Sequence, residues 1–133
     1  MTIPRSRHLS VVIAASPDAV YRFAADPDNL PRWATGLAAG IRRRGDLIIA
    51  DSPMGEVTVL FAPRNAFGIL DHDVTLPDGT VVGNPLRVIA HPDGAEVVFT
   101  VRQRDLTDSQ FDADCAAVQR DLESLRDAVT GAS

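Results

Sequence analysis

The C-terminal part of the chain carries an apolar stripe with helical spacing, and this stripe limits the possible folds more than any other feature. Apolar residues recur there at intervals of four and three positions, which places them on one face of an α-helix. They are Phe111, Cys115, Val118, Leu122, Leu125 and Val129. The opposite face carries Asp112, Arg120, Glu123 and Asp127. A helix of about five turns with one apolar face must pack that face against another apolar surface.

Two local signals mark the start of this helix. Thr107 and Gln110 are spaced as a capping box, in which each side chain accepts a hydrogen bond from the backbone N–H of the other residue. Leu106 and Phe111 stand on either side of the cap, at the spacing of a hydrophobic staple. The sequence therefore fixes where the chain enters the helix.

Residues 37–103 have the alternation and the turn residues of β-strands. Proline presets the backbone angle φ of a turn and glycine allows φ above zero, so these residues are strong turn signals. Turns are predicted at residues 45–46, 52–55, 63–65, 77–79 and 92–94. With the first strand of the chain they delimit about seven strands, mostly antiparallel because the connections are too short for crossovers. Pro85 cannot donate a ladder hydrogen bond, so a bulge or an interruption is predicted near Asn84.

The N-terminal part begins with a strand and continues with two short helices. Residues 8–13 alternate between polar and apolar positions, as in a strand with one buried face. Ser16 is a capping residue, and it predicts a helix over Pro17–Ala25 with proline at its first position. A second, very short helix is expected to carry Leu30 and Trp33.

The order of a strand, two short helices, further strands and one long helix predicts a single α+β domain over residues 1–133. Residues 16–37, 67–101 and 108–125 resemble the START-related SRPBCC superfamily, most closely its small bacterial polyketide cyclase/dehydrase-like members. The resemblance covers nearly the whole chain. It implies the helix-grip fold, a curved antiparallel sheet around the long C-terminal helix. It also implies an internal cavity that the two short helices close at one end.

The charge of the chain argues against nucleic acid as a partner. The net charge is −5 at pH 7, whereas phosphate binding requires a basic surface. The basic run at residues 42–44 has acidic neighbours in the sequence and is interpreted as a solvated strand end. No apolar run approaches the roughly 20 residues of a membrane span. We therefore expect a cytoplasmic protein with no membrane partner.

Two residue counts exclude whole classes of chemistry. All 13 basic residues are arginine, because the chain has no lysine, and this excludes Schiff-base chemistry. The single cysteine, Cys115, excludes an internal disulfide and any zinc site built from several cysteines. His8, His72 and His91 lack the spacing of metal ligands. We expect neither a cofactor nor a metal.

The polar sequence Asp71-His72-Asp73 lies in an otherwise apolar strand and decides how the site is interpreted. Successive side chains of a strand point to opposite faces, so His72 and the two aspartates are separated. Two carboxylates in an apolar interior would carry a large desolvation cost. We therefore predict that His72 points into the cavity and that the aspartates lie outside beside Arg87. A regular strand cannot bring all three side chains to one metal.

The inner faces of the strands predict a mainly apolar cavity with few polar groups. The expected ligand-binding residues are His72, Trp33, Phe61, Phe99, Gln103, Leu70, Val74 and Leu86. At the rim we expect Trp33, Tyr21, Asn84 and Arg43. Such a pocket suits an apolar or aromatic ligand that one or two hydrogen bonds orient.

Three functions remain open. The first is the binding of a small hydrophobic or aromatic ligand in the cavity. The second is a polyketide cyclase/dehydratase-like enzyme, in which His72 is the general base and Gln103 or Trp33 positions the substrate. The sequence places no nucleophile or orienting carboxylate beside His72, so it leaves open whether the protein is an enzyme. The third is an interaction module, a homodimer through an exposed strand edge or the outer sheet face.

Overall fold

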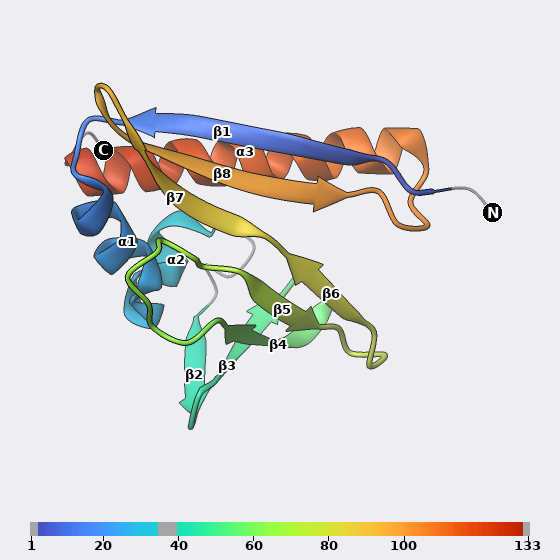
Figure 1. The fold of residues 1–133 in the computed structure, drawn as a ribbon. Coiled ribbons are helices and arrows are strands. Elements are labelled where there is room, and N and C mark those ends of the chain that lie inside the picture. Colours follow the sequence, from blue (N-terminus) through green and yellow to red (C-terminus); the bar gives the residue numbers. More distant parts are fainter. Residues whose placement is uncertain (1–2, 35–39, 132–133) are drawn as a thin grey trace.

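The structure, a computed structural model, describes residues 3–34 and 40–131. Its helices are α1 (Pro17–Ala25), the 3₁₀ turn η1 (Pro27–Asn29), α2 (Leu30–Trp33) and α3 (Asp108–Thr130). Its strands are β1 (Ser6–Ile13), β2 (Ile41–Arg44), β3 (Leu47–Ser52), β4 (Gly55–Phe61), β5 (His72–Thr75), β6 (Val81–Asn84), β7 (Leu86–His91) and β8 (Gly94–Arg102). The predicted α+β class and order of elements are confirmed (Figure 1).

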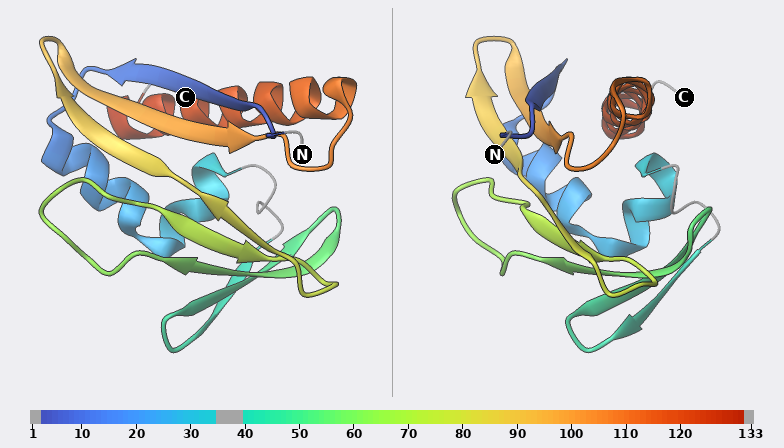
Figure 2. Two further views of the ribbon diagram at one scale, coloured as in Figure 1. Left: turned by 45° about the vertical axis from the view of Figure 1, so that its right-hand side comes forward. Right: turned by 90° about the vertical axis from the view of Figure 1, so that its right-hand side faces the viewer.

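The strands form two antiparallel sheets that bend around the long helix. One sheet has the order β1-β8-β7, and the other has the order β2-β3-β4-β5-β6. The right-hand panel of Figure 2 looks along α3. It shows strands on two sides of this helix, with α1 and α2 between it and the lower strands. This is the helix-grip arrangement that the resemblance implied.

The short helices begin at the capping residues that the sequence indicated. The Ser16 hydroxyl accepts a hydrogen bond from the Ala19 N–H at 3.1 Å, so α1 spans the predicted residues. Asp26 caps the next turn by accepting from the Asp28 N–H at 3.0 Å. The chain then enters α2, whose Leu30 and Trp33 are both buried in the main core. The position of Trp33 is thus set by two successive caps.

The long helix α3 packs its apolar stripe against the sheet, as predicted. Both hydrogen bonds of the Thr107–Gln110 capping box are present, at 2.9 and 3.1 Å. The fully buried members of the stripe are Phe111, Cys115, Leu122 and Leu125. Figure 1 shows α3 running alongside β1 and β8. The stripe therefore covers the core on the side opposite the five-stranded sheet β2-β3-β4-β5-β6.

Pro85 interrupts the sheet, as the sequence predicted. It separates β6 from β7, and these two strands belong to different sheets. This division gives eight strands in the described part of the chain, where the turn signals indicated about seven. The expected strand start at Leu37 lies outside the described residues. The residues that precede β5 lie outside the five-stranded sheet and run beside β7, where Ile69 pairs with Arg87.

Two side chains replace a ladder hydrogen bond that is missing between Leu70 and Leu86, next to this interruption. The Leu70 N–H donates to the Leu86 carbonyl at 2.8 Å, and in a regular antiparallel pair the Leu86 N–H would return the bond. Instead, the Leu86 N–H donates to Asp71 Oδ1 at 2.9 Å. The Leu70 carbonyl receives His72 Nδ1 at 3.0 Å. Asp71 and His72 therefore satisfy the two ends of one broken backbone bond.

Arg87 holds Asp71 in this position from the outer face. Its guanidinium makes two hydrogen bonds to the Asp71 carboxylate, at 2.8 and 2.7 Å. These bonds lower the pKa of Asp71 below its usual value, although partial burial opposes the shift. Asp73 lies opposite Gly83 in the ladder and is exposed. The predicted outer pair with Arg87 is thus formed by Asp71.

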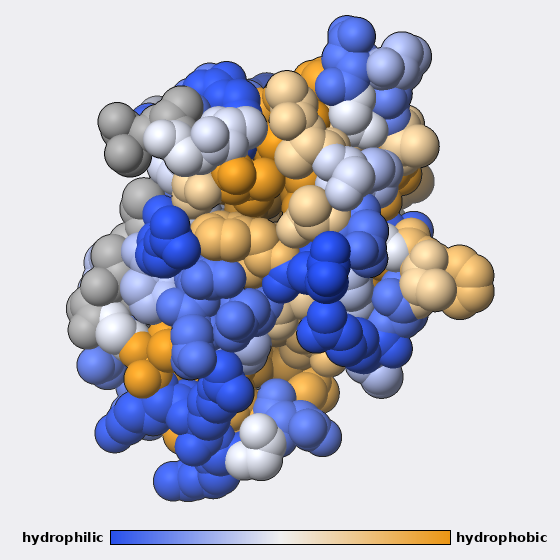
Figure 3. Space-filling model, turned by 90° about the vertical axis from the view of Figure 1, so that its left-hand side faces the viewer, coloured by the Kyte–Doolittle hydropathy of each residue, from blue (hydrophilic) through white to orange (hydrophobic). Residues whose placement is uncertain are grey.

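Exposed apolar side chains are scattered over the surface. In residues 3–34 and 40–131 the most exposed large ones are Ile3, Met54, Phe67 and Val81, which lie in different elements or loops. Apolar and hydrophilic side chains are interspersed on the face that Figure 3 shows. This distribution does not single out a docking surface, so the homodimeric module stays a prediction.

We predict that Asp71→Ala lowers the free energy of unfolding by about 1–3 kcal/mol, because the buried Leu86 N–H loses its acceptor. Asp71→Asn keeps an acceptor oxygen and should lose less. Asp73→Ala is the matched control and should change the free energy by less than about 0.5 kcal/mol. Urea unfolding followed by circular dichroism measures all three. Equal losses for Asp71→Ala and Asp73→Ala would contradict the assigned role.

Candidate functional site

A cavity of about 170 Å³ lies between the sheet and the helices α2 and α3. We call it the site cavity. Its lining residues come from α2 and the residue after it, from β4, β5 and β8, and from α3. They are Leu30, Trp33, Ala34, Val59, Phe61, His72, Val74, Phe99, Val118, Asp121 and Leu122. Wider hollows elsewhere are more open to the surface, and one of them, with Asp73 and Asn84 in its wall, shares Phe61 and His72 with the site cavity.

The structure brings together five of the eight residues expected to bind a ligand. His72, Trp33, Phe61, Phe99 and Val74 all line the site cavity. The other two apolar candidates belong to the filled part of the core, where Leu70 is 3% and Leu86 is 0% exposed.

The residues expected at the rim, apart from Trp33, lie outside the site cavity. The Tyr21 hydroxyl accepts from the Asn65 N–H, and Arg43 pairs with Asp28. Asn84 faces the wider hollow.

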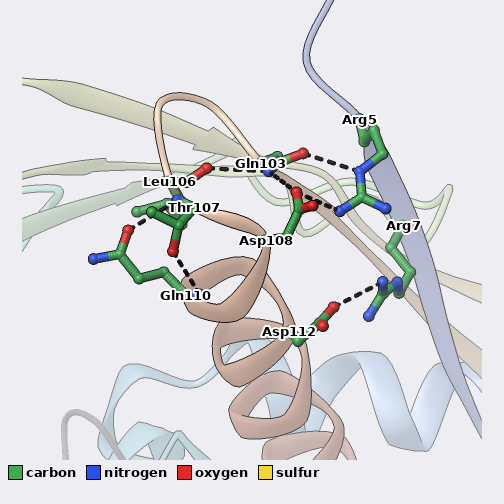
Figure 4. Close-up of polar contacts among 8 residues, drawn as sticks. All are labelled: Arg5, Arg7, Gln103, Leu106, Thr107, Asp108, Gln110 and Asp112. Carbon is green, nitrogen blue, oxygen red and sulfur yellow. Dashed lines mark hydrogen bonds and ion pairs between the residues drawn. The ribbon is translucent and has the colours of Figure 1, made fainter.

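Gln103 lies away from the site cavity, at the start of α3. Its side chain amide donates to Asp108 at 2.8 Å and to the Leu106 carbonyl at 3.0 Å, and its oxygen accepts from Arg5 (Figure 4). Strand parity placed Gln103 on the inner face, but β8 ends at Arg102 and parity does not extend beyond the strand. Gln103 thus joins the loop before α3 to the N-terminal residues beside β1.

His72 presents one defined ring nitrogen for chemistry. Because a carbonyl oxygen only accepts, the bond to Leu70 requires the proton on Nδ1 and leaves Nε2 with its lone pair. No described residue hydrogen-bonds to Nε2. The ring lies against Phe61, with centroids 4.8 Å apart, and edge-on to Phe99 at 5.8 Å. Burial among these rings lowers the pKa of His72, while the bond to Leu70 opposes the shift.

Trp33 contributes a donor that the described part of the protein leaves unused. The side chain is 3% exposed, and its indole Nε1 is buried without a hydrogen-bond partner. An unpaired buried N–H costs about 1–3 kcal/mol, and most native proteins avoid it. An unpaired indole N–H in a residue that lines a cavity is therefore a candidate anchor for a ligand.

Asp121 is the lining residue that sequence reasoning missed. It belongs to α3 and brings a carboxylate to an otherwise apolar wall. The available signal was its spacing, because residue 121 lies three positions after Val118 and adjoins the same helix face. A charged residue next to an apolar stripe is ordinarily expected on the solvent-facing side of a helix. The site cavity thus combines apolar walls with three polar side chains, those of His72, Trp33 and Asp121.

The described residues form neither a metal-binding cluster nor a membrane-spanning helix. Within residues 3–34 and 40–131, no three His, Cys, Asp or Glu side chains cluster closely enough to hold a metal ion. None of the helices in the same ranges combines the length and apolar character needed to cross a bilayer.

We predict that stability falls as the pH is lowered below about 6.5, where an unfolded imidazole takes up a proton. The folded protein resists that proton because burial lowers the pKa of His72. The stabilising effect of the neutral ring is therefore full above pH 6.5 and is lost toward the lowered pKa. His72→Asn, whose amide can still donate to Leu70, should flatten the change in melting temperature between pH 7.5 and 5.5.

His91→Asn is the control for the loss of an imidazole, because His91 lies in the β7–β8 turn. Carboxylates titrate mostly below this interval, so they contribute little to the comparison. If His72→Asn has the same pH dependence as the wild-type protein, the buried neutral ring is not its source.

Comparison with known proteins identifies the family of the fold. A family model described as "Polyketide cyclase / dehydrase and lipid transport" matches residues 6–130. No curated protein matches the chain. A conserved protein from Geobacillus kaustophilus is 10% identical with a TM-score of 0.76, over 96% of each chain. The Aha1 dimer from Colwellia psychrerythraea is 18% identical with a TM-score of 0.69, over 99% of each chain.

The structure of Ara h 8.0201 is also similar, at 11% identity and a TM-score of 0.68, covering 97% of this chain and 99% of that one. At these identities the structural likeness shows the shared fold and nothing more specific. The family model, however, matches nearly the whole chain, in agreement with the resemblance to the SRPBCC superfamily. This chain therefore belongs to the polyketide cyclase / dehydrase and lipid transport family.

Proposed function

We propose that this protein binds a small hydrophobic or aromatic molecule in the site cavity. The observation that carries the proposal is the cavity itself, about 170 Å³ in volume and lined mostly by aliphatic and aromatic side chains. A cavity of about 150 Å³ with similar walls accepts benzene. The available space therefore suits one aromatic ring or an aliphatic group of similar size.

Three aromatic rings of the lining lie against one another. Phe61, His72 and Phe99 form a cluster of rings at 4.8 and 5.8 Å between centroids. Aromatic pairs at such distances attract one another through offset-stacked or edge-to-face contacts. A flat ligand could extend this cluster, which favours an aromatic guest over a branched aliphatic one.

The family description supports the same class of ligand. It names polyketide cyclisation, dehydration and lipid transport, and all three involve molecules with extended apolar or aromatic parts. This shared chemistry supports an apolar or aromatic ligand.

We predict that toluene raises the melting temperature of the wild-type protein and changes the fluorescence of Trp33, the single tryptophan of the chain. Val118→Phe should abolish both effects, because it fills the cavity from α3. Val81→Phe is the control, since residue 81 is 58% exposed and lies outside the cavity. Thermal unfolding by circular dichroism and fluorescence titration supply the readouts. The same response to toluene in all three proteins, or no response in the wild type, would refute binding at this site.

A second candidate function is a cyclase or dehydratase, and the observation that favours it is His72 Nε2, to which no described residue hydrogen-bonds. A neutral imidazole with a free lone pair can take a proton from a carbon between two carbonyl groups and return it to a leaving hydroxyl group. Trp33 could donate to a substrate carbonyl. Gln103, which the sequence suggested for this role, lies outside the cavity.

For this candidate, we expect the wild-type protein to convert a linear β-polyketone thioester, with loss of water detected by mass spectrometry. His72→Asn should abolish the conversion without unfolding the protein, because an asparagine amide can still donate to the Leu70 carbonyl. Activity that persists in His72→Asn would remove this mechanism.

A further inference from the structure

Resting on the proposed binding function, we infer that the ligand is a neutral single-ring aromatic alcohol, held by the Trp33 indole N–H and by His72 Nε2. Apolar walls and volume restrict size and shape, but they accept many molecules equally well. The polar groups of the site cavity restrict which functional groups the ligand can carry.

The first requirement is an acceptor for Trp33. Its Nε1 is buried and has no partner among the described residues, and an indole N–H can only donate. A purely apolar guest would leave this donor unpaired. A hydroxyl, ether or carbonyl oxygen would pair with it.

The second requirement is a donor for His72. The bond from Nδ1 to the Leu70 carbonyl fixes the tautomer, so Nε2 can only accept while the ring is neutral. Ethers and carbonyls have no proton to give to Nε2, and an ammonium group has no lone pair to offer Trp33. A hydroxyl group does both through a single oxygen atom, which favours it over ethers, carbonyls and ammonium groups.

The third requirement concerns charge. The lining residues of the site cavity include Asp121 and no arginine, and the chain contains no lysine. A buried carboxylate or phosphate would therefore lack a cationic partner, and burying an unpaired charge is costly. Fatty acids and other anions are disfavoured, whereas an un-ionised phenol meets all three requirements.

The test compares p-cresol with p-xylene, which has a methyl group in place of the hydroxyl, and with 4-methylbenzoate as the anion. Affinity is measured by calorimetry on the full chain. A phenol loses hydrogen bonds to water on binding, so the informative quantity is the ratio of the p-cresol and p-xylene affinities in each protein.

We expect Trp33→Phe and His72→Asn each to weaken p-cresol binding about tenfold while changing p-xylene binding little. The single indole N–H resonance of the wild-type protein should move downfield with p-cresol and less with p-xylene. 4-Methylbenzoate should not bind. Val118→Phe, which fills the cavity, should bind neither neutral compound.

The outcomes separate the two proposals. If p-xylene binds but neither variant changes the affinity ratio, or if 4-methylbenzoate binds as tightly as p-cresol, the alcohol is the wrong class and cavity binding stands. If no compound binds the wild-type protein, ligand binding itself is overturned and this inference with it. A tenfold loss specific to p-cresol in both variants supports the inference.

Discussion

The interruption of the sheet at Pro85 is the constraint on which the arrangement of this site depends. Pro85 cannot donate a ladder hydrogen bond, and the chain passes from one sheet to the other at this residue. Beside it, the Leu86 N–H and the Leu70 carbonyl do not bond to each other. Asp71 and His72 pair with these two backbone groups through side chain atoms instead. The change of sheet and the orientation of the cavity histidine thus occur at the same place in the fold.

The two ring nitrogens of His72 consequently have different roles. Nδ1 serves the backbone, and this bond determines that Nε2 is the unprotonated nitrogen. Rings on two sides restrict the imidazole further, and burial keeps it neutral by lowering its pKa. A histidine held in this way needs no carboxylate partner to fix its tautomer. The lack of a carboxylate on the same strand face as His72 is therefore a weak argument against chemistry at this ring.

Much of the fold could be predicted from the sequence because its signals are local. The capping box at Thr107, the cap at Ser16 and the period of the apolar stripe each depend on residues within a few positions of one another. Pro85 acts through its own missing donor. Strand parity also placed His72 and Asp71 on opposite faces. The residues of the site were harder to predict, because the side chains that reach the cavity depend on where each strand ends and on how tightly the core is packed. Gln103 lies one residue beyond β8, and Leu86 is packed too closely to leave space beside it.

The polar atoms of the site cavity set it apart from a packing defect. A gap between apolar side chains leaves no polar group unsatisfied, and it costs stability only through lost contacts. Among the described residues, this cavity adds a buried indole N–H without a hydrogen-bond partner, so the ligand-free protein also loses a hydrogen bond that water would have supplied in the unfolded chain. Stable folds retain such arrangements mainly where function requires them. If the protein were a scaffold alone, the apolar walls and the bend at Pro85 would still be explained, but the burial of Trp33 Nε1 without a partner among the described residues would have no explanation.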